Sequence, residues 1–129
     1  MVNPYVNNIE SETLGNDYFR KEIFTGEHMQ LTVMAIPVGG NIGMETHPHT
    51  DQFLRVEQGT GKVILGGVEH DVMDDFAIII PAGVEHNVIN TGDIPMKLYS
   101  IYTPPNHPQG TIDKTQTDAI AREEAEGHH

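Results

Sequence analysis

The chain has 129 residues, a length that fits one domain. Acidic residues outnumber basic ones by 19 to 7, and the resulting formal net charge of −12 argues against nucleic acid or an anionic membrane as a partner. The absence of cysteine excludes disulfides, thiolate metal sites and cysteine nucleophiles, and it is compatible with a cytoplasmic location. The N-terminal segment has no basic and apolar signal pattern, and no apolar run approaches the roughly 20 residues of a membrane-spanning helix.

In chain order, residues 1–17 are polar and predict a loosely attached, flexible arm. Residues 18–103 predict an antiparallel β-barrel, because short apolar or alternating runs are broken by turn residues. The predicted strands are 19–24, 31–36, 43–49, 53–57, 62–65, 68–72, 76–80, 86–90 and 97–102. Gly66-Gly67 predicts a two-residue hairpin turn. Residues 104–125 form a tail with one short predicted helix at 117–125, and residues 126–129 are typical of an expression tag.

Candidate metal ligands are concentrated in the stretch GMETHPHTDQ, residues 43–52. Glu45, His47 and His49 occupy alternate positions of a predicted strand, so their side chains are expected to point to one face. If that face lines the interior of a barrel, a metal or a hydrogen-bond network must satisfy them, because burying them unpaired is costly. Gln52 follows closely, and His86 begins another strand after a tight turn. Imidazole, carboxylate and carboxamide groups together indicate a divalent metal site.

A second stretch, DDFAIIIPAGVEHNVIN at residues 74–90, resembles the second conserved motif of the cupin superfamily. That motif has Gly, five residues, Pro-x-Gly, two residues, His, three residues and Asn. Pro81, Gly83, His86 and Asn90 match it at the right spacing, and Asp75 stands where the family has Gly.

The first cupin motif, which has Gly, five residues, His-x-His, three or four residues, Glu, six residues and Gly, can be aligned with this chain in two registers. If His47 and His49 are the histidine pair, only two residues precede Gln52, and Asn41 stands at the glycine position. This first register therefore breaks the spacing of the motif.

The second register takes Glu45 and His47 as the pair, between Gly39 and Gly59. It fits every interval of the motif, with Glu in place of the first His and Gln52 in place of the Glu. We favour this register.

His47, Gln52 and His86 are metal ligands in both registers, and the fourth ligand is Glu45 in one register and His49 in the other. The resemblance implies a small single-domain cupin with a jelly-roll barrel that binds a divalent transition metal such as Zn, Mn, Fe or Ni. It also implies isomerase- or dioxygenase-like chemistry on a small organic molecule, with Glu45 as the catalytic base if that residue does not bind the metal.

The alternative is a non-catalytic cupin that binds or senses a small ligand, with or without a metal. Small cupins of this kind usually form homodimers, for which the N-terminal arm and an edge strand at 19–24 are candidates.

The expected ligand set resembles that of type I phosphomannose isomerases, and small cupins of this type often carry a phosphomannose-isomerase-like label. A phosphosugar site needs basic residues, however, and we find Arg55, Lys62 and Lys97 in the predicted barrel strands. Arg55 is expected to point outward because Gln52 points inward. Three other histidines, His28, His70 and His107, are expected at the surface.

Overall fold

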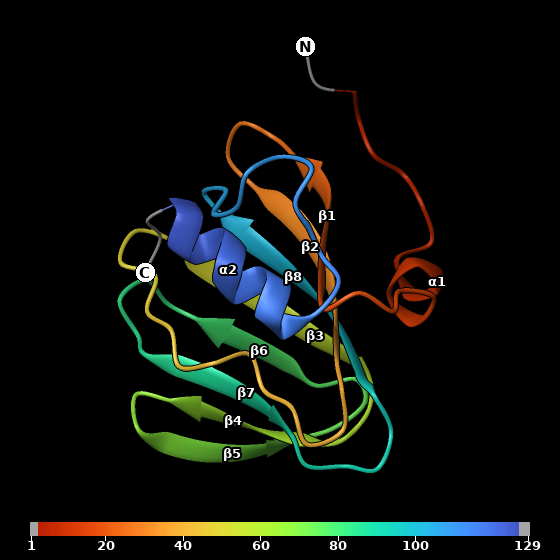
Figure 1. Cartoon of the computed structure of the whole chain (residues 1–129), viewed down its shortest axis with the longest axis vertical. Coiled ribbons are helices and arrows are strands. Elements are labelled where there is room, and N and C mark those ends of the chain that lie inside the picture. The colour runs from red at the N-terminus through yellow and green to blue at the C-terminus, as the bar shows by residue number, and fades with distance from the viewer. Residues whose placement is uncertain (1–2, 127–129) are drawn as a thin grey trace.

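A computed structural model of the chain describes residues 3–126 and consists mainly of antiparallel β-structure (Figure 1). The predicted fold class, an antiparallel jelly-roll barrel with a short C-terminal helix, is confirmed. The elements are α1 (Ile9–Leu14), β1 (Arg20–Thr25), β2 (Gln30–Ile36), β3 (Asp51–Gln58), β4 (Gly61–Leu65), β5 (Val68–Val72), β6 (Ala77–Ile80), β7 (His86–Asn90), β8 (Met96–Thr103), β9 (Ile112–Asp113) and α2 (Gln116–Glu126).

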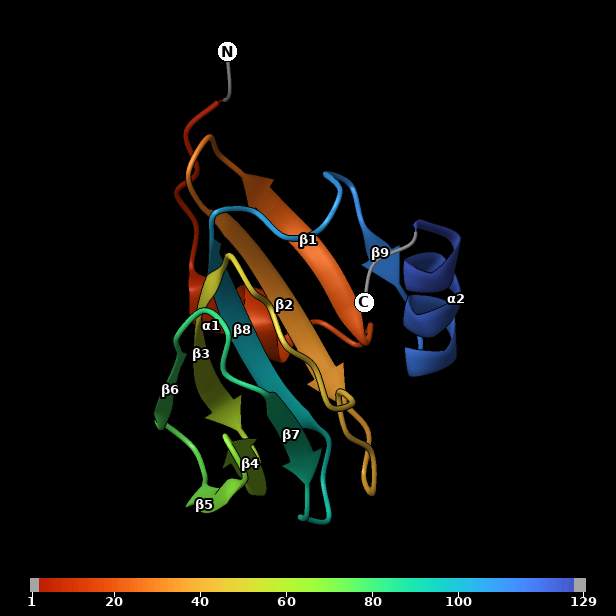
Figure 2. The ribbon, with the colours of Figure 1, turned by 90° about the vertical axis from the view of Figure 1, so that its left-hand side faces the viewer.

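Two sheets form the barrel. The larger sheet has the strand order β6-β3-β8-β2-β1-β9, and the smaller sheet has the order β5-β4-β7. Figure 2 shows the smaller sheet next to one end of the larger one, with α1 and α2 on opposite sides of the larger sheet. No helix among residues 3–126 is long and apolar enough to cross a membrane.

Strand alternation divides the inner face of the larger sheet into a polar and an apolar part. Gln30 and Gln52 flank Tyr102 in the pairing register, and all three side chains are buried. Further along the strands, the inward positions become apolar. These apolar residues, which form most of the core together with the smaller sheet, include Met34, Ile36, Leu54, Val56, Met96 and Leu98.

Two turns follow the sequence closely. Gly66 and Gly67 have φ values of 55° and 83°, and Leu65 pairs with Val68, which confirms the predicted two-residue hairpin. Asp75, which stands at a glycine position of the cupin motif, has a φ of 72°. Asp tolerates this left-handed conformation better than most residues, so the turn is retained without glycine.

The predicted strand at 43–49 is wrong, because this segment forms no regular strand. Asn41 and Glu45 each form an isolated bridge, to Ile89 and His86 respectively. Gly43 lies between them with a φ of 91°, which interrupts the extended backbone. The strand predicted at 19–24 is present as β1, but it is not an edge strand because it pairs with both β2 and β9.

The structure also contains two elements that the sequence did not predict, α1 and β9. Helix α1 lies within the predicted arm, begins with the Asn8 side chain accepting a hydrogen bond from the Ser11 amide, and contacts β2, β3 and β8. Helix α2 confirms the helix predicted at 117–125. Most of the predicted tag, residues 127–129, lies outside the described residues.

Candidate metal centre

Three side chains with metal-binding atoms meet at the polar part of the barrel interior. One ligand atom from each of Glu45, His47 and His86 lies within 4.8 Å of the other two. The Glu45 Oε2 atom is 3.2 Å from His47 Nε2, and the two imidazole centroids are 5.2 Å apart. The side chains of Glu45 and His47 are 21% and 14% exposed, whereas His86 is fully buried. The cluster therefore borders solvent on one side and the core on the other.

Backbone hydrogen bonds hold these residues together although they come from different parts of the chain. The Glu45 amide donates to the His86 carbonyl at 2.9 Å, and the His86 amide donates to the Glu45 carbonyl at 2.8 Å. The amide of Gly83 donates to the His47 carbonyl at 2.9 Å, so the turn before β7 is tied to the same segment. The two cupin-like motifs therefore meet at the cluster.

Among the buried side-chain polar atoms without a hydrogen-bond partner in the described part of the chain, one on His86 and one on Gln52 are suited to binding a metal. The His86 ring contacts the Val84 carbonyl through Nδ1 at 2.9 Å, which leaves Nε2 without a partner. The Gln52 side chain is 3% exposed, and its Nε2 donates to Ser100 Oγ at 2.9 Å, which leaves Oε1 without a partner. The chemistry of these atoms fits a divalent transition metal.

The structure separates the two candidates for the remaining ligand position. His49 lies exposed in a turn after Pro48, away from the cluster that Glu45 joins. The expectation that His49 points to the same face as Glu45 and His47 assumed a regular strand, which this segment does not form. Gly39 and Gly59, the glycine positions of the favoured register, have φ values of 77° and 111°.

The surroundings of Glu45 favour the ionised form of its side chain. Burial raises the pKa of Glu45, but the hydrogen bond with His47 and the positive charge of Arg20 more than offset this effect, so the net shift is downward. Burial lowers the pKa of His86, and the contact with the Val84 carbonyl only partly opposes the shift. At neutral pH the cluster therefore contains an ionised carboxylate and a neutral His86 imidazole, the protonation states in which both bind metals.

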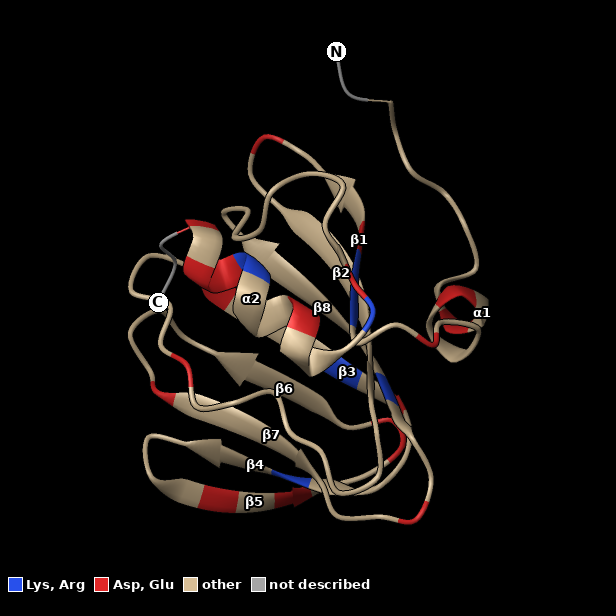
Figure 3. Cartoon of the chain, viewed as in Figure 1, with Lys and Arg blue, Asp and Glu red and all other residues tan. Residues whose placement is uncertain are grey.

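Arg20 borders the cluster, although it is not among the basic strand residues singled out from the sequence. Its side chain is 2% exposed, and its Nη2 atom lies 4.0 Å from Glu45 Oε1. Its Nη1 atom lies 3.6 Å from Asp113 Oδ2 and 3.2 Å from Glu123 Oε1. Figure 3 shows that α2, which carries Glu123, has basic as well as acidic residues. The available signal was Arg20 itself, a charged residue inside a predicted strand, together with the acidic C-terminal helix. Arg55, in contrast, points outward as predicted.

His107 is buried, so its prediction as a surface histidine is wrong. The Gln30 side chain accepts hydrogen bonds from the amides of Asn106 and His107 at 3.1 and 2.9 Å, which holds this loop against the barrel. The His107 ring packs at 5.1 Å from the ring of Tyr102, which lies 6.0 Å from the His47 ring. Burial raises the pKa of Tyr102, so its phenol stays protonated beside the cluster.

Comparisons with known proteins agree with this geometry. The family model of the cupin domain matches residues 32–102. The uncharacterized protein YrkC of Bacillus subtilis is 51% identical over 127 residues, which cover 94% of this chain and 68% of that protein. A crystal structure of a Bacillus halodurans protein has a TM-score of 0.91 and 54% identity, covering 92% of this chain and 95% of that one.

A further relative fits the phosphomannose-isomerase-like label. A mannose-1-phosphate guanylyltransferase of Klebsiella pneumoniae is 29% identical over 68 residues. These residues cover 53% of this chain but 14% of that enzyme. The likeness is therefore confined to a small part of the larger protein.

Proposed function

Because the chain belongs to the cupin family, we propose that it binds a divalent transition metal in its barrel and acts there on a small organic molecule. Glu45, His47 and His86 would hold the metal. The observation that carries this proposal is the convergence of their ligand atoms to within 4.8 Å of one another. Gln52 would be the fourth ligand through Oε1, because its amide nitrogen is already used by Ser100.

The donor set limits which metals fit the site and sets the net charge of the bound ion. Two imidazoles, one carboxylate and one amide oxygen suit Zn, Mn, Fe or Ni. The single carboxylate leaves a divalent ion with a net charge near +1. When bound, the metal would polarise a carbonyl or enolate oxygen of the substrate, as isomerase- and dioxygenase-like reactions require.

The other residues of the site have separable tasks in this proposal. His86 is held by the Val84 carbonyl in the tautomer that presents Nε2 to the centre. The buried Tyr102 phenol hydrogen-bonds Ser100 and Thr32 and would remain a neutral polar group beside the cluster. Glu45 binds the metal in the favoured register, and where it is released from the metal its carboxylate is the base that moves a substrate proton.

A second function, ligand binding without a metal, is supported by one contact. Glu45 Oε2 lies 3.2 Å from His47 Nε2, so these two residues can satisfy each other directly. In that case the barrel would bind or sense a small molecule without catalysis.

Metal analysis of tag-free protein separates the two functions. The proposed centre predicts close to one equivalent after incubation with Zn, Mn, Fe, Ni or Co, lost in His47→Ala and in His86→Ala. Glu45→Ala is expected to lose most of the metal, whereas its matched control, His49→Ala, retains it. Less than about one-tenth of an equivalent of each metal in the wild type would exclude the metal function.

The homodimer also remains a proposal, and exposed apolar residues on the larger sheet support it. Ile79 on β6 is 66% exposed, and it pairs across the sheet with the partly exposed Phe53, which pairs with Ile101. These residues form an apolar row on the outer face, suited to a second copy. Light scattering should give twice the mass of the chain, and Ile79→Glu should reduce it to that of a monomer.

A further inference from the structure

We propose that Arg20 positions Glu45 in the candidate metal centre, and that Asp113 and Glu123 position Arg20. The inference rests on the proposed function, because it concerns how one ligand of that centre is held. We call Arg20, Asp113, Arg122 and Glu123 the charged bracket.

Arg20 joins three carboxylates from three separate segments. Its Nη2 atom faces Glu45 in the segment before β3, whereas its Nη1 atom faces Asp113 of β9 and Glu123 of α2. A guanidinium stays charged in proteins, and a buried charge must be compensated. Because the guanidinium is planar and its nitrogens point in fixed directions, fixing one side of the group also fixes the side that faces Glu45.

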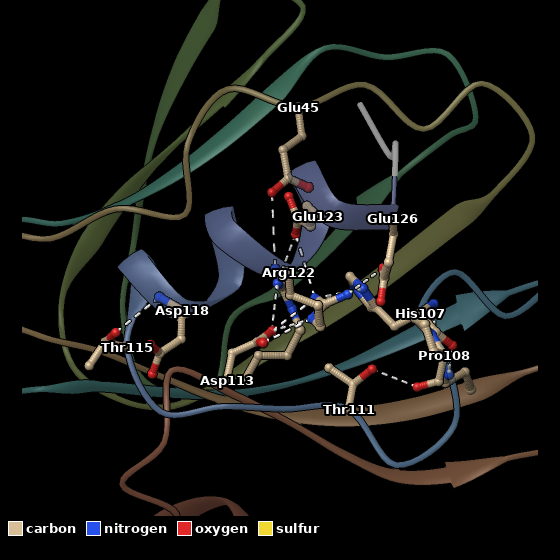
Figure 4. Close-up of polar contacts among 12 residues, drawn as sticks. Glu45, His107, Pro108, Thr111, Asp113, Thr115, Asp118, Arg122, Glu123 and Glu126 are labelled. Carbon is tan, nitrogen blue, oxygen red and sulfur yellow. Dashed lines mark hydrogen bonds and ion pairs between the residues drawn. The ribbon is translucent and has the colours of Figure 1, made fainter.

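The far side of the bracket is held firmly. Arg122 donates from Nε to both carboxylate oxygens of Asp113, at 2.9 and 3.1 Å, and from Nη2 to Oδ2 at 2.8 Å. The pairing of β1 with β9 places Arg20 directly opposite Asp113. Arg122 also lies 2.9 Å from Glu126, one turn further along α2. Figure 4 shows Glu45 and Asp113 on opposite sides of the group of charged side chains that includes Arg122 and Glu123. The charged bracket is thus held in place by contacts that do not involve the candidate metal ligands.

Glu45 is the residue of the cluster that most needs such support. It lies outside the regular strands and is held by an isolated bridge to His86. One of its oxygens lies near His47 and the other near Arg20, so the carboxylate is oriented from both sides. Outer partners of this kind set the orientation of a metal ligand.

The bracket lies outside the part of the chain that matches the cupin family model. That match covers residues 32–102, whereas Arg20 precedes it and Asp113, Arg122 and Glu123 follow it. Position 45 has Glu where the cupin motif has His, and the bracket supplies a positive charge that a carboxylate, but not a neutral imidazole, can use. The first strand and the last helix therefore belong to the site.

Zinc affinity in a double-mutant cycle tests the inference. Arg20→Gln is introduced into the wild type and into Glu45→His, in which the carboxylate is replaced by a neutral ligand. Tag-free proteins are titrated with Zn²⁺ against a competing chelator. Arg20→Gln is expected to weaken binding about tenfold or more in the wild type. In Glu45→His it should change the affinity by less than about twofold or tighten it, because no carboxylate remains to be positioned.

Equal losses in the two backgrounds would overturn the inference and leave the proposed function standing. A wild type that binds no zinc and none of the other metals would overturn both. Arg20→Lys is the second variant, because it keeps the charge beside Asp113 and loses the planar guanidinium. Arg20→Lys should fold and lose less zinc affinity than Arg20→Gln, and this loss should again be present only when Glu45 is present. Arg55→Gln is the matched control, since Arg55 also contacts two carboxylates but is exposed, and its zinc affinity should equal that of the wild type.

Discussion

Gln52→Glu tests the assignment of the fourth ligand, because it puts the residue of the cupin motif at this position. In the metal-free protein the new carboxylate is buried at a site where Gln52 is 3% exposed, and its protein partner is the Ser100 hydroxyl. Burial of an incompletely satisfied polar group costs about 1–3 kcal/mol. For a domain of this size, about 1 kcal/mol shifts Tm by roughly 4 °C, so the metal-free variant should melt about 4–12 °C below the wild type.

With metal the effect reverses, because the anionic ligand attracts a divalent cation more strongly than an amide does. An affinity gain of about tenfold adds about 1.4 kcal/mol of stabilisation at saturating metal. Gln52→Glu should therefore show a larger metal-induced rise in Tm than the wild type, by roughly 6 °C.

The assay is thermal unfolding with a chelator and with saturating Zn²⁺. Gln58→Glu is the matched control, because Gln58 lies at the other end of β3 and bonds the Pro95 carbonyl at the surface. Its metal-induced rise in Tm should equal that of the wild type. If Gln52→Glu also showed the wild-type rise, Gln52 would not be a ligand, and an unchanged Tm without metal would show that the position is not desolvated.

Two further predictions concern stability. Burial lowers the folded-state pKa of His86 below its ordinary value of 6.5. Just below that pH the unfolded chain therefore binds more protons than the folded protein does. The metal-free protein should lose stability as the pH falls through about 6.5. Urea unfolding at about pH 7 and about pH 5.5 measures this loss of stability. A pH dependence that persists unchanged in His86→Asn would assign it to another group. The lowered pKa of Glu45 affects stability only below about pH 4.5. Gly61→Ala would place a Cβ atom in a steric clash with the Ile89 carbonyl oxygen, so β4 and β7 must separate. The free energy of unfolding should therefore fall by about 2 kcal/mol or more. A urea midpoint equal to that of the wild type would contradict this packing.

The barrel could be predicted from the sequence because its signals are local. The alternation that predicts a strand at 53–57 extends in the structure to β3, Asp51–Gln58, and the Gly66-Gly67 turn follows from two residues. The spacing of the cupin motifs likewise favoured Glu45 over His49, and the structure places Glu45 beside the two histidines.

The rest depends on contacts that no local pattern records. Arg20 and Glu123 are 103 positions apart, and their contact exists only because α2 returns to β1. His107 lies in a loop, where exposure is the usual expectation. The Gln30 side chain, however, hydrogen-bonds the backbone carbonyl and amide of His107 and holds that loop against the barrel. Helix α1 has six residues, too few for a clear helical period.

The return of α2 to β1 also sets an order of events during folding. Contacts between residues so distant in sequence form late, because the chain must lose the entropy of a long loop before they are made. During synthesis from the N-terminus, both cupin motifs are made before the helix that completes the charged bracket. A nascent chain can therefore bring His47 and His86 together before Arg20 has its partners. Completion of the charged bracket around Glu45 is then a late step of folding and not its nucleus.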